Sequence, residues 1–223
     1  MTHTIADLLQ PLAQAREVVV FTGAGLSADS GIPTFRDGAT GLWANIDPEE
    51  VVSIEGFERD PDKVWAWHES MRSLVADVCP NAGHDEIAEL ESLLPNARVT
   101  VVTQNIDGLH QAAGSKTVYE LHGSTLRNYC TRCGKFYPVS FIEEAGGKGD
   151  GVPLCTDCGG IVKPDVVLYE EGLDEATIEG AVSAIRRADM LIVGGTSLAV
   201  YPAAGLIRYF RGDDLVVINK QPT

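Results

Sequence analysis

The chain has 223 residues, of which 44% are hydrophobic and 22% are charged. This length suits one large domain, or one domain with a smaller insert, and the composition is that of an ordinary soluble globular protein. No apolar run approaches the ~20 residues that span a bilayer. The N-terminus also lacks the basic start, apolar middle and small-residue cleavage site of a secretory signal. We therefore expect a cytoplasmic protein.

The charge is strongly acidic, with 17 Lys and Arg residues against 32 Asp and Glu residues and a formal net charge of -15. Such a charge opposes capture of nucleic-acid phosphates and of anionic membranes, so we expect neither partner. A basic partner, such as a lysine-rich peptide, is mildly favoured. Solubility or a salt-adapted source is the simpler explanation of the acidity, so charge alone identifies no substrate. The sequence does not indicate an oligomeric state.

Helical spacing of Ile5, Leu8, Leu9 and Leu12 predicts a first helix. The β-branched run 17–22, which leads into glycines, predicts a buried strand. After a helix that begins near Asp60, the pattern predicts the following order: helix 83–94, strand 97–105, strand 162–169, helix 174–188, strand 189–197, helix 202–210 and strand 214–219. Alternating strands and helices indicate an α/β fold with a Rossmann-like, doubly wound parallel sheet.

Ligands of such a sheet bind at the carboxyl ends of its strands. Glycine-rich or polar sequence follows four predicted strands, at 22–27, 103–108, 194–198 and 218–221. Gly23, Gly25 and Ala28 match G-x-G-x-x-A directly after a strand, a pattern that lets backbone N–H groups approach a pyrophosphate. A glycine turn without a ligand is the alternative. The acidic residue that dehydrogenases carry ~20 positions further on is not convincingly present.

The segment 31–38, GIPTFRDG, follows this loop at once. A proline, an aromatic residue and an arginine so close to a phosphate loop suggest a flap over the nucleotide. The alternative is an ordinary surface loop with Phe35 in the core.

Four of the five cysteines form two CxxC pairs with the spacing C-x2-C-x21-C-x2-C. Four thiolates with this spacing predict a tetrahedral zinc site, and because protein atoms fill every position the zinc should be structural. The predicted metal ligands are Cys130, Cys133, Cys155 and Cys158.

Polar residues also gather after the strand that ends near residue 103. Gln104, Asn105 and Asp107 can hydrogen-bond a ribose or a carboxamide, although Asp107 could equally cap a helix. His122 ends a short strand beside a glycine and is a candidate general base. The settings of His84 and His110 do not suggest a site.

Together, the segments GAGLSADSGIPTFRDG, TQNIDGLH, LHGS, KPDVVLY, GTSL and IN and the two CxxC pairs resemble the sirtuin family, bacterial type, over nearly the whole chain. The resemblance implies a Rossmann-like NAD-binding large domain of residues 1–38, 76–125 and 162–223. It also implies a small domain formed by a helical insert, residues 39–75, and a zinc-binding module, residues 126–161.

The resemblance further implies an NAD-dependent protein-lysine deacetylase that consumes NAD as a co-substrate and has an acetylated lysine-containing protein or peptide as partner. Its products would be nicotinamide, O-acetyl-ADP-ribose and the deacetylated lysine. His122 and Asn105 match the catalytic positions, with His122 as general base. Val167 and Tyr169 match the acyl-lysine tunnel. The implied NAD-binding residues are Gly23, Ala24, Gly25, Ala28, Phe35, Arg36, Gln104, Asn105, Ile106, Asp107, His122, Gly195, Thr196, Ser197 and Asn219.

Family members that remove succinyl or malonyl groups carry a Tyr and an Arg three residues apart. His68 and Met71 stand at the matching positions, and a Met cannot pair with a carboxylate, so the resemblance implies a preference for neutral acyl groups. Protein ADP-ribosyl transfer or NAD hydrolysis by a sirtuin-like enzyme is the alternative activity. A zinc-stapled nucleotide sensor without turnover and an NAD-linked dehydrogenase are weaker alternatives.

Overall fold

A computed structural model describes residues 5–35, 41–44, 46–146 and 151–220. Its centre is a five-stranded parallel sheet with the order β3 (Val118–Glu120), β2 (Arg98–Thr103), β1 (Glu17–Thr22), β7 (Met190–Gly194) and β8 (Asp214–Ile218). The predicted doubly wound parallel sheet is confirmed. The strand order changes direction between β1 and β7, and a crevice at the carboxyl ends is expected at such a switch point.

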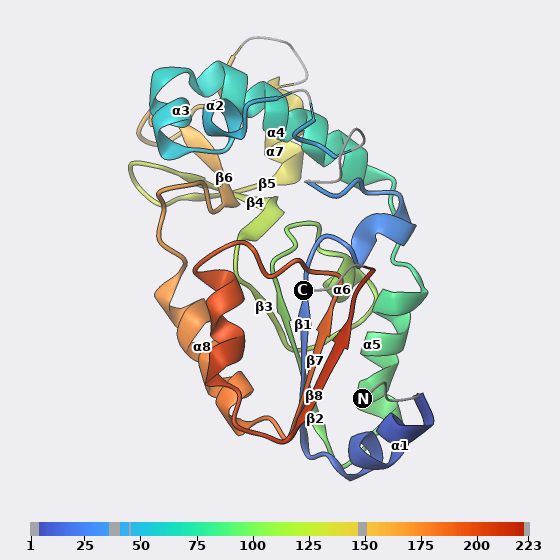
Figure 1. The fold of residues 1–223 in the computed structure, drawn as a ribbon. Coiled ribbons are helices and arrows are strands. Elements are labelled where there is room, and N and C mark those ends of the chain that lie inside the picture. Colours follow the sequence, from blue (N-terminus) through green and yellow to red (C-terminus); the bar gives the residue numbers. More distant parts are fainter. Residues whose placement is uncertain (1–4, 36–40, 45, 147–150, 221–223) are drawn as a thin grey trace.

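The sheet is covered on both faces because successive side chains of a strand point to opposite sides. Val18 and Val20 of β1 pack in one core with residues of α1 (Ile5–Gln14) and α5 (Ala82–Leu93). Val19 and Phe21 pack in another core with residues of α8 (Glu175–Arg187) and the 3-10 helix η2 (Ala203–Tyr209). Figure 1 shows α8 on one side of the sheet and α1 and α5 on the other. These four β1 side chains are almost completely buried. Burial of each one stabilises the folded state by about 1.5–3 kcal/mol relative to leaving it exposed.

A second, antiparallel sheet has the order β5 (Phe136–Pro138), β4 (Gly123–Cys130) and β6 (Val162–Val166). The prediction that residues 162–169 form a strand of the parallel sheet was therefore wrong. In β6, buried residues alternate with the half-buried Lys163 and Asp165, and Pro164 cannot donate to a ladder. Alternation of this kind suits a small half-exposed sheet, whereas strands buried on both faces are continuously apolar.

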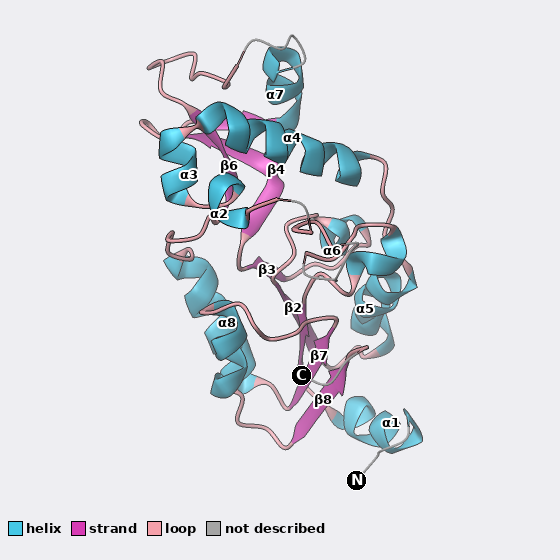
Figure 2. Cartoon of the chain, turned by 45° about the horizontal axis from the view of Figure 1, so that its top comes forward, coloured by secondary structure: helices cyan, strands magenta, loops and turns pink. Residues whose placement is uncertain are grey.

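Helices α2 (Pro48–Val51), α3 (Ile54–Arg59), α4 (Pro61–Ala76) and α7 (Val139–Gly146) gather around this antiparallel sheet (Figure 2). Asp60 caps α4 by accepting a 3.1 Å hydrogen bond from the backbone N–H of Lys63. One hydrophobic core joins the helices to the cysteine-bearing strands and loops, and it includes Val51, Phe57, Trp65, Trp67, Met71, Cys130, Tyr137, Ile142 and Cys155.

Most other predicted elements are present. The expected helix at 202–210 is the 3-10 helix η2, and two short elements at strand ends were not predicted: the 3-10 helix η1 (Ser27–Ser30) and α6 (Leu109–Ala112). Within the described residues, no helix combines the length and apolar character required to cross a membrane.

Candidate functional site

The carboxyl ends of three strands meet through side-chain hydrogen bonds. The Gln104 amide, which follows β2, donates from Nε2 to Thr196 Oγ1 after β7 at 2.9 Å. Asn219, which follows β8, donates from Nδ2 to the Thr196 carbonyl oxygen at 3.1 Å. Predicted site residues from three separate parts of the chain are thus brought together at one edge.

The glycines of the β1 and β7 loops allow these loops to touch. A Cβ on Gly25 would lie 2.8 Å from the carbonyl oxygen of Gly195, and a Cβ on Gly23 would lie 2.7 Å from Thr196 Cβ. Gly195 has φ 63°, and a Cβ there would lie 2.3 Å from the Leu26 nitrogen. The predicted glycine pattern therefore first provides close loop–loop packing, and the same bare backbone suits the approach of a pyrophosphate.

Other residues predicted to bind NAD line the same loops with different exposure. Ala24 is half-buried, whereas Ala28 in η1 and Ser197 after β7 are exposed. Ile106 is half-buried, and its carbonyl oxygen accepts hydrogen bonds from Thr125 N and Oγ1, both at 3.0 Å. Arg36, predicted to belong to the flap, lies outside the described residues.

Ser27 connects the predicted carboxamide-binding residues. Its hydroxyl donates to Asp107 Oδ2 at 2.6 Å and accepts from Asn105 Nδ2 at 3.0 Å. Asp107 Oδ1 also accepts from the backbone N–H of Leu109, the first residue of α6, at 3.0 Å, although the N-cap residue of this helix is Gly108. Ser27, Asn105 and Asp107 are all buried, which favours fully paired polar groups.

Two histidines for which the sequence suggests no site lie next to these residues. His84 and His110 are both fully buried, with ring centroids 5.0 Å apart. His84 Nε2 lies 3.5 Å from Ser27 Oγ, and His110 Nε2 lies 2.9 Å from Thr22 Oγ1. The structure therefore places both rings in contact with residues of the candidate site, a setting that the sequence did not suggest. Only contacts between distant segments reveal their setting, so spacing along the chain carried no signal for it.

His122 is held at its side chain and at its backbone. Nδ1 lies 3.0 Å from the carbonyl oxygen of Gln104. A carbonyl can only accept, so Nδ1 carries the proton and the neutral ring keeps its lone pair on Nε2. Burial lowers the pKa of His122 from its usual 6.5, although the bond to Gln104 opposes this shift. The His122 carbonyl oxygen accepts from Val167 N at 3.0 Å. The ring is therefore neutral and correctly protonated for a general base near neutral pH.

Val167 and Tyr169 lie in the loop after β6, which also contacts the helical insert. Tyr169 N donates to the Val52 carbonyl oxygen at 2.7 Å, and the Tyr169 carbonyl oxygen accepts from Ile54 N at 3.2 Å. The Trp43 ring lies between the rings of Phe35 and Tyr169, with centroid distances of 5.2 Å and 6.1 Å. Phe35, which belongs to the described part of the expected flap, is thus connected through the Trp43 ring to Tyr169, one of the two predicted acyl-lysine residues.

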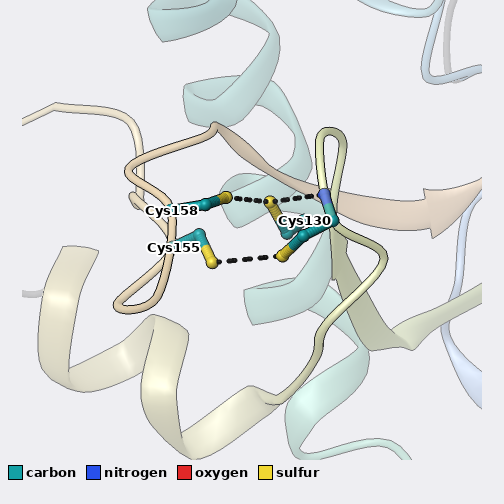
Figure 3. Close-up of side chains that lie close together, drawn as sticks. Cys130, Cys155 and Cys158 are labelled. Atoms are coloured by element: carbon teal, nitrogen blue, oxygen red, sulfur yellow. Dashed lines mark hydrogen bonds between the residues drawn. The ribbon is translucent and has the colours of Figure 1, made fainter.

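The four predicted cysteines form one cluster, and their Sγ atoms all lie within 4.8 Å of one another. The Cys130 and Cys158 Sγ atoms are 3.5 Å apart, and those of Cys133 and Cys155 are 3.6 Å apart, as Figure 3 shows for the labelled residues. Four thiolates around zinc at about 2.3 Å would stand roughly 3.8 Å apart, so the cluster fits a tetrahedral ion. The Arg132 backbone N–H and the Tyr137 hydroxyl donate to sulfurs at 3.4 Å and 3.1 Å, as partners of thiolate ligands do.

Comparison with known proteins gives one family. A model of the Sir2 family matches residues 23–202. A protein of Clostridium perfringens described as an NAD-dependent protein deacetylase is 51% identical over 229 residues, which cover 100% of this chain and 91% of that protein. A Mycobacterium tuberculosis protein described as an NAD-dependent protein deacylase is 45% identical over 208 residues, covering 92% and 86%.

Solved structures agree. The crystal structure of a Sir2 homolog–NAD complex has a TM-score of 0.88 and 39% identity, and the match covers 100% of this chain and 85% of that one. A structure of Sir2 bound to acetylated peptide has a TM-score of 0.85 and 34% identity, with coverage of 99% and 88%. The family model, the curated relatives and the fold all agree with the site geometry, and the chain therefore belongs to the Sir2 family, the sirtuins.

Proposed function

We propose that this protein is an NAD-dependent protein-lysine deacetylase that uses NAD as a co-substrate. The observation that carries the proposal is the setting of His122, a neutral imidazole whose Nδ1 is bound to the Gln104 carbonyl oxygen at 3.0 Å. Its free Nε2 can take a proton at the edge of the sheet where the predicted NAD-binding residues converge. The names of the relatives support the same activity.

For NAD, we assign the phosphates to the β1 and β7 loops around Gly23, Gly25 and Thr196. The ribose and carboxamide fall to Gln104, Asn105 and Asp107, whose amides and carboxylate offer the matching donors and acceptors. When bound, NAD supplies the ribose that takes up the acetyl group and the nicotinamide that leaves. His122 then removes a proton from a ribose hydroxyl, while the buried surroundings keep water away.

The acetylated peptide is assigned to the loop that carries Val167 and Tyr169. Extended peptides often bind by adding a strand beside exposed backbone. Main-chain hydrogen bonds then supply the affinity, and pockets that accept alternate side chains supply the specificity. Val167 N is bonded to the carbonyl oxygen of His122, so a lysine side chain guided by Val167 would arrive beside the general base. A Sir2 structure described as bound to acetylated peptide supports this class of partner.

We further propose a preference for acetyl and other neutral acyl groups over succinyl or malonyl groups. Burial lowers the pKa of His68 to about 3, so this ring is neutral, and Met71 is buried and uncharged. Neither side chain offers a cation to an acyl carboxylate. The charge of Arg72, also buried, has the carboxylates of Glu69 and Glu143 as neighbours.

A structural zinc ion held by the four cysteines belongs to the same proposal. Such an ion would join the strand ends of the antiparallel sheet and contribute to folding rather than to the reaction. We also propose the domain division implied by the sequence, with residues 39–75 and 126–161 as the small domain. The core shared by the insert and the cysteine loops supports this grouping.

Nicotinamide release in the presence of NAD, with and without an acetyl-lysine peptide, tests the function. We expect release to depend on the peptide and to match the deacetylated product one for one. His122→Ala should lower kcat/KM for deacetylation by about 10²–10⁴-fold. Release that does not need the peptide would instead indicate NAD hydrolysis, and a label transferred from NAD to protein would indicate ADP-ribosyl transfer. Acetyl-lysine and succinyl-lysine peptides compared at equal concentration test the acyl preference, and faster desuccinylation would refute it.

A further inference from the structure

A single peptide group links the proposed general base to the protein interior. The carbonyl oxygen of Gln104, which accepts from His122 Nδ1 at 3.0 Å, and the N–H of Asn105 belong to the same planar unit. On its other side, the Asn105 N–H donates to Thr103 Oγ1 at 3.0 Å. Because the unit is rigid, a tilt imposed on its N–H side also moves the oxygen that orients His122.

Thr103 is in turn fixed by a buried chain of hydrogen bonds. Thr22 and Thr103 end adjacent parallel strands as register partners, and Thr22 Oγ1 donates to Thr103 Oγ1 at 2.8 Å. His110, from α6, lies with Nε2 at 2.9 Å from Thr22 Oγ1. Thr22, Thr103 and His110 are each at most 2% exposed, so these bonds are shielded from water.

The donors of the chain all run in one direction. With Thr22 Oγ1 as the donor to Thr103 Oγ1, Thr22 Oγ1 accepts from His110, which then carries its proton on Nε2. His110 Nδ1 is then a bare acceptor, and it has no hydrogen-bond partner among the described residues. His110 therefore donates to Thr22, and Thr22 donates to Thr103. Thr103 Oγ1 also accepts a hydrogen bond from the Asn105 N–H.

We infer that His110, Thr22 and Thr103 form a positioning relay for His122, acting through the Gln104–Asn105 peptide group. All three are buried and act through another group, and their role is to hold the carbonyl that keeps His122 in the Nδ1-protonated form. This inference rests on the proposed function only for its kinetic consequence, because the protonation state of His122 can be measured without turnover.

The test uses the full chain labelled with ¹⁵N-histidine, and long-range ¹H–¹⁵N spectra report which ring nitrogen carries the proton. His122→Ala and His110→Leu assign the two signals by their loss. In the unsubstituted protein we expect the proton on Nδ1 of His122 and on Nε2 of His110. The opposite form at either ring overturns the relay, whether or not Thr103→Val folds and whether or not the protein deacetylates.

Thr103→Val removes the hydroxyl at nearly constant shape. We expect the His122 signals to shift toward a mixture of the two protonated forms and kcat for deacetylation to fall about 10-fold, with both KM values changed less than about twofold. His110→Leu should act in the same direction. His110→Gln, whose side-chain amide can still donate to Thr22, should restore most of the rate.

Ser115→Ala is the matched control, because Ser115 Oγ is buried and has no partner among the described residues. It should leave the His122 spectrum and kcat unchanged. Unchanged His122 signals in folded Thr103→Val protein would contradict the inference. If Ser115→Ala lost as much rate as Thr103→Val, the effect would be due to general packing near the site and the relay would be refuted.

Discussion

Ser27 Oγ lies 2.6 Å from Asp107 Oδ2, and this short bond joins a serine of the glycine loop to the buried polar residues that follow β2. The same oxygen accepts from Asn105 Nδ2 at 3.0 Å. The loop expected to bind phosphates and the residues expected to bind the carboxamide are therefore one hydrogen-bonded unit. A substitution in the loop should therefore also alter the positions of the residues expected to bind the carboxamide.

Ser27→Ala should impair nicotinamide release and lower stability together. It leaves the Asn105 amide and the Asp107 carboxylate without their shared partner, at a cost of about 1–3 kcal/mol for buried groups. Nicotinamide release with saturating acetylated peptide and urea unfolding would measure the two effects. Ser70→Ala is the control, because Ser70 is exposed and its Oγ donates to the Trp67 carbonyl oxygen of its own helix. Wild-type nicotinamide release by Ser27→Ala would contradict the assignment of the carboxamide to Asn105 and Asp107.

Gly123→Ala should be severely destabilising. Gly123 has φ 74°, and a Cβ there would lie 1.9 Å from the carbonyl oxygen of Asp165, in the strand that pairs with it. The strained backbone alone costs about 1–3 kcal/mol, and the collision adds to it. Gly134→Ala is the matched comparison, with φ 70° and no atom within 4 Å of the Cβ position.

Unfolding curves of the two glycine variants should therefore differ, with Gly123→Ala the less stable. Deacetylation should also fall further in Gly123→Ala, because Gly123 follows His122 directly. Equal losses in both variants would show that the φ angle alone matters.

Tyr137→Phe should weaken zinc retention without removing a ligand. The Tyr137 hydroxyl donates to Cys155 Sγ at 3.1 Å and accepts from Thr156 N at 2.8 Å. Loss of such an outer partner typically costs 10–100-fold in metal affinity. Zinc release to a chromogenic chelator measures the effect, and Tyr129→Phe, on an exposed ring of the same sheet, is the control. Identical release from both variants would exclude a role for the Tyr137 bond.

Stability should fall as the pH falls from about 6.5 toward 5. Burial lowers the pKa values of His68 and His110 to about 3, whereas in the unfolded chain both titrate near 6.5. Between these values the unfolded state binds more protons than the folded state, so the free energy of unfolding rises with pH by up to about 1.4 kcal/mol per pH unit for each histidine. Above pH 7 both states are neutral and this contribution is constant.

Urea unfolding at pH 5, 6, 7 and 8 with excess zinc would measure this slope. The positive charges of Lys163 and Arg72 reinforce the effect of burial at His68, and protonation of His84 would further disfavour protonation of His110. His68→Gln should remove about half of the slope due to the two residues. A slope unchanged in this variant would show that His68 is not buried and neutral.

The sequence predicted those parts of the molecule that depend on local pattern. The helix at Asp60, the strands of the parallel sheet and the cysteine cluster follow from capping, apolar runs and ligand spacing. Where pairing partners decide the outcome, prediction failed: β6 has a plausible strand sequence, yet only its partner β4 makes it part of the antiparallel sheet.

The candidate site divides in the same way. Residues after predicted strands, such as Gln104 and His122, could be proposed for the site from sequence because parallel strands bring their carboxyl ends to one edge. Ser27, His84 and His110 could not, because their partners come from segments far away in the chain. Nothing in the spacing around His110 shows that it reaches Thr22 at the end of β1.

The position of β1 between β2 and β7 also matters during synthesis. Val18 pairs with Val99 on one side and with Met190 on the other, so the central strand is complete only after a segment much later in the chain has been synthesised. Until that segment emerges from the ribosome, one edge of the apolar strand β1 is unpaired and can pair with strands of other chains. Pairing between segments so far apart in the sequence is also slow. We expect the nascent chain to need shielding of this edge by a chaperone.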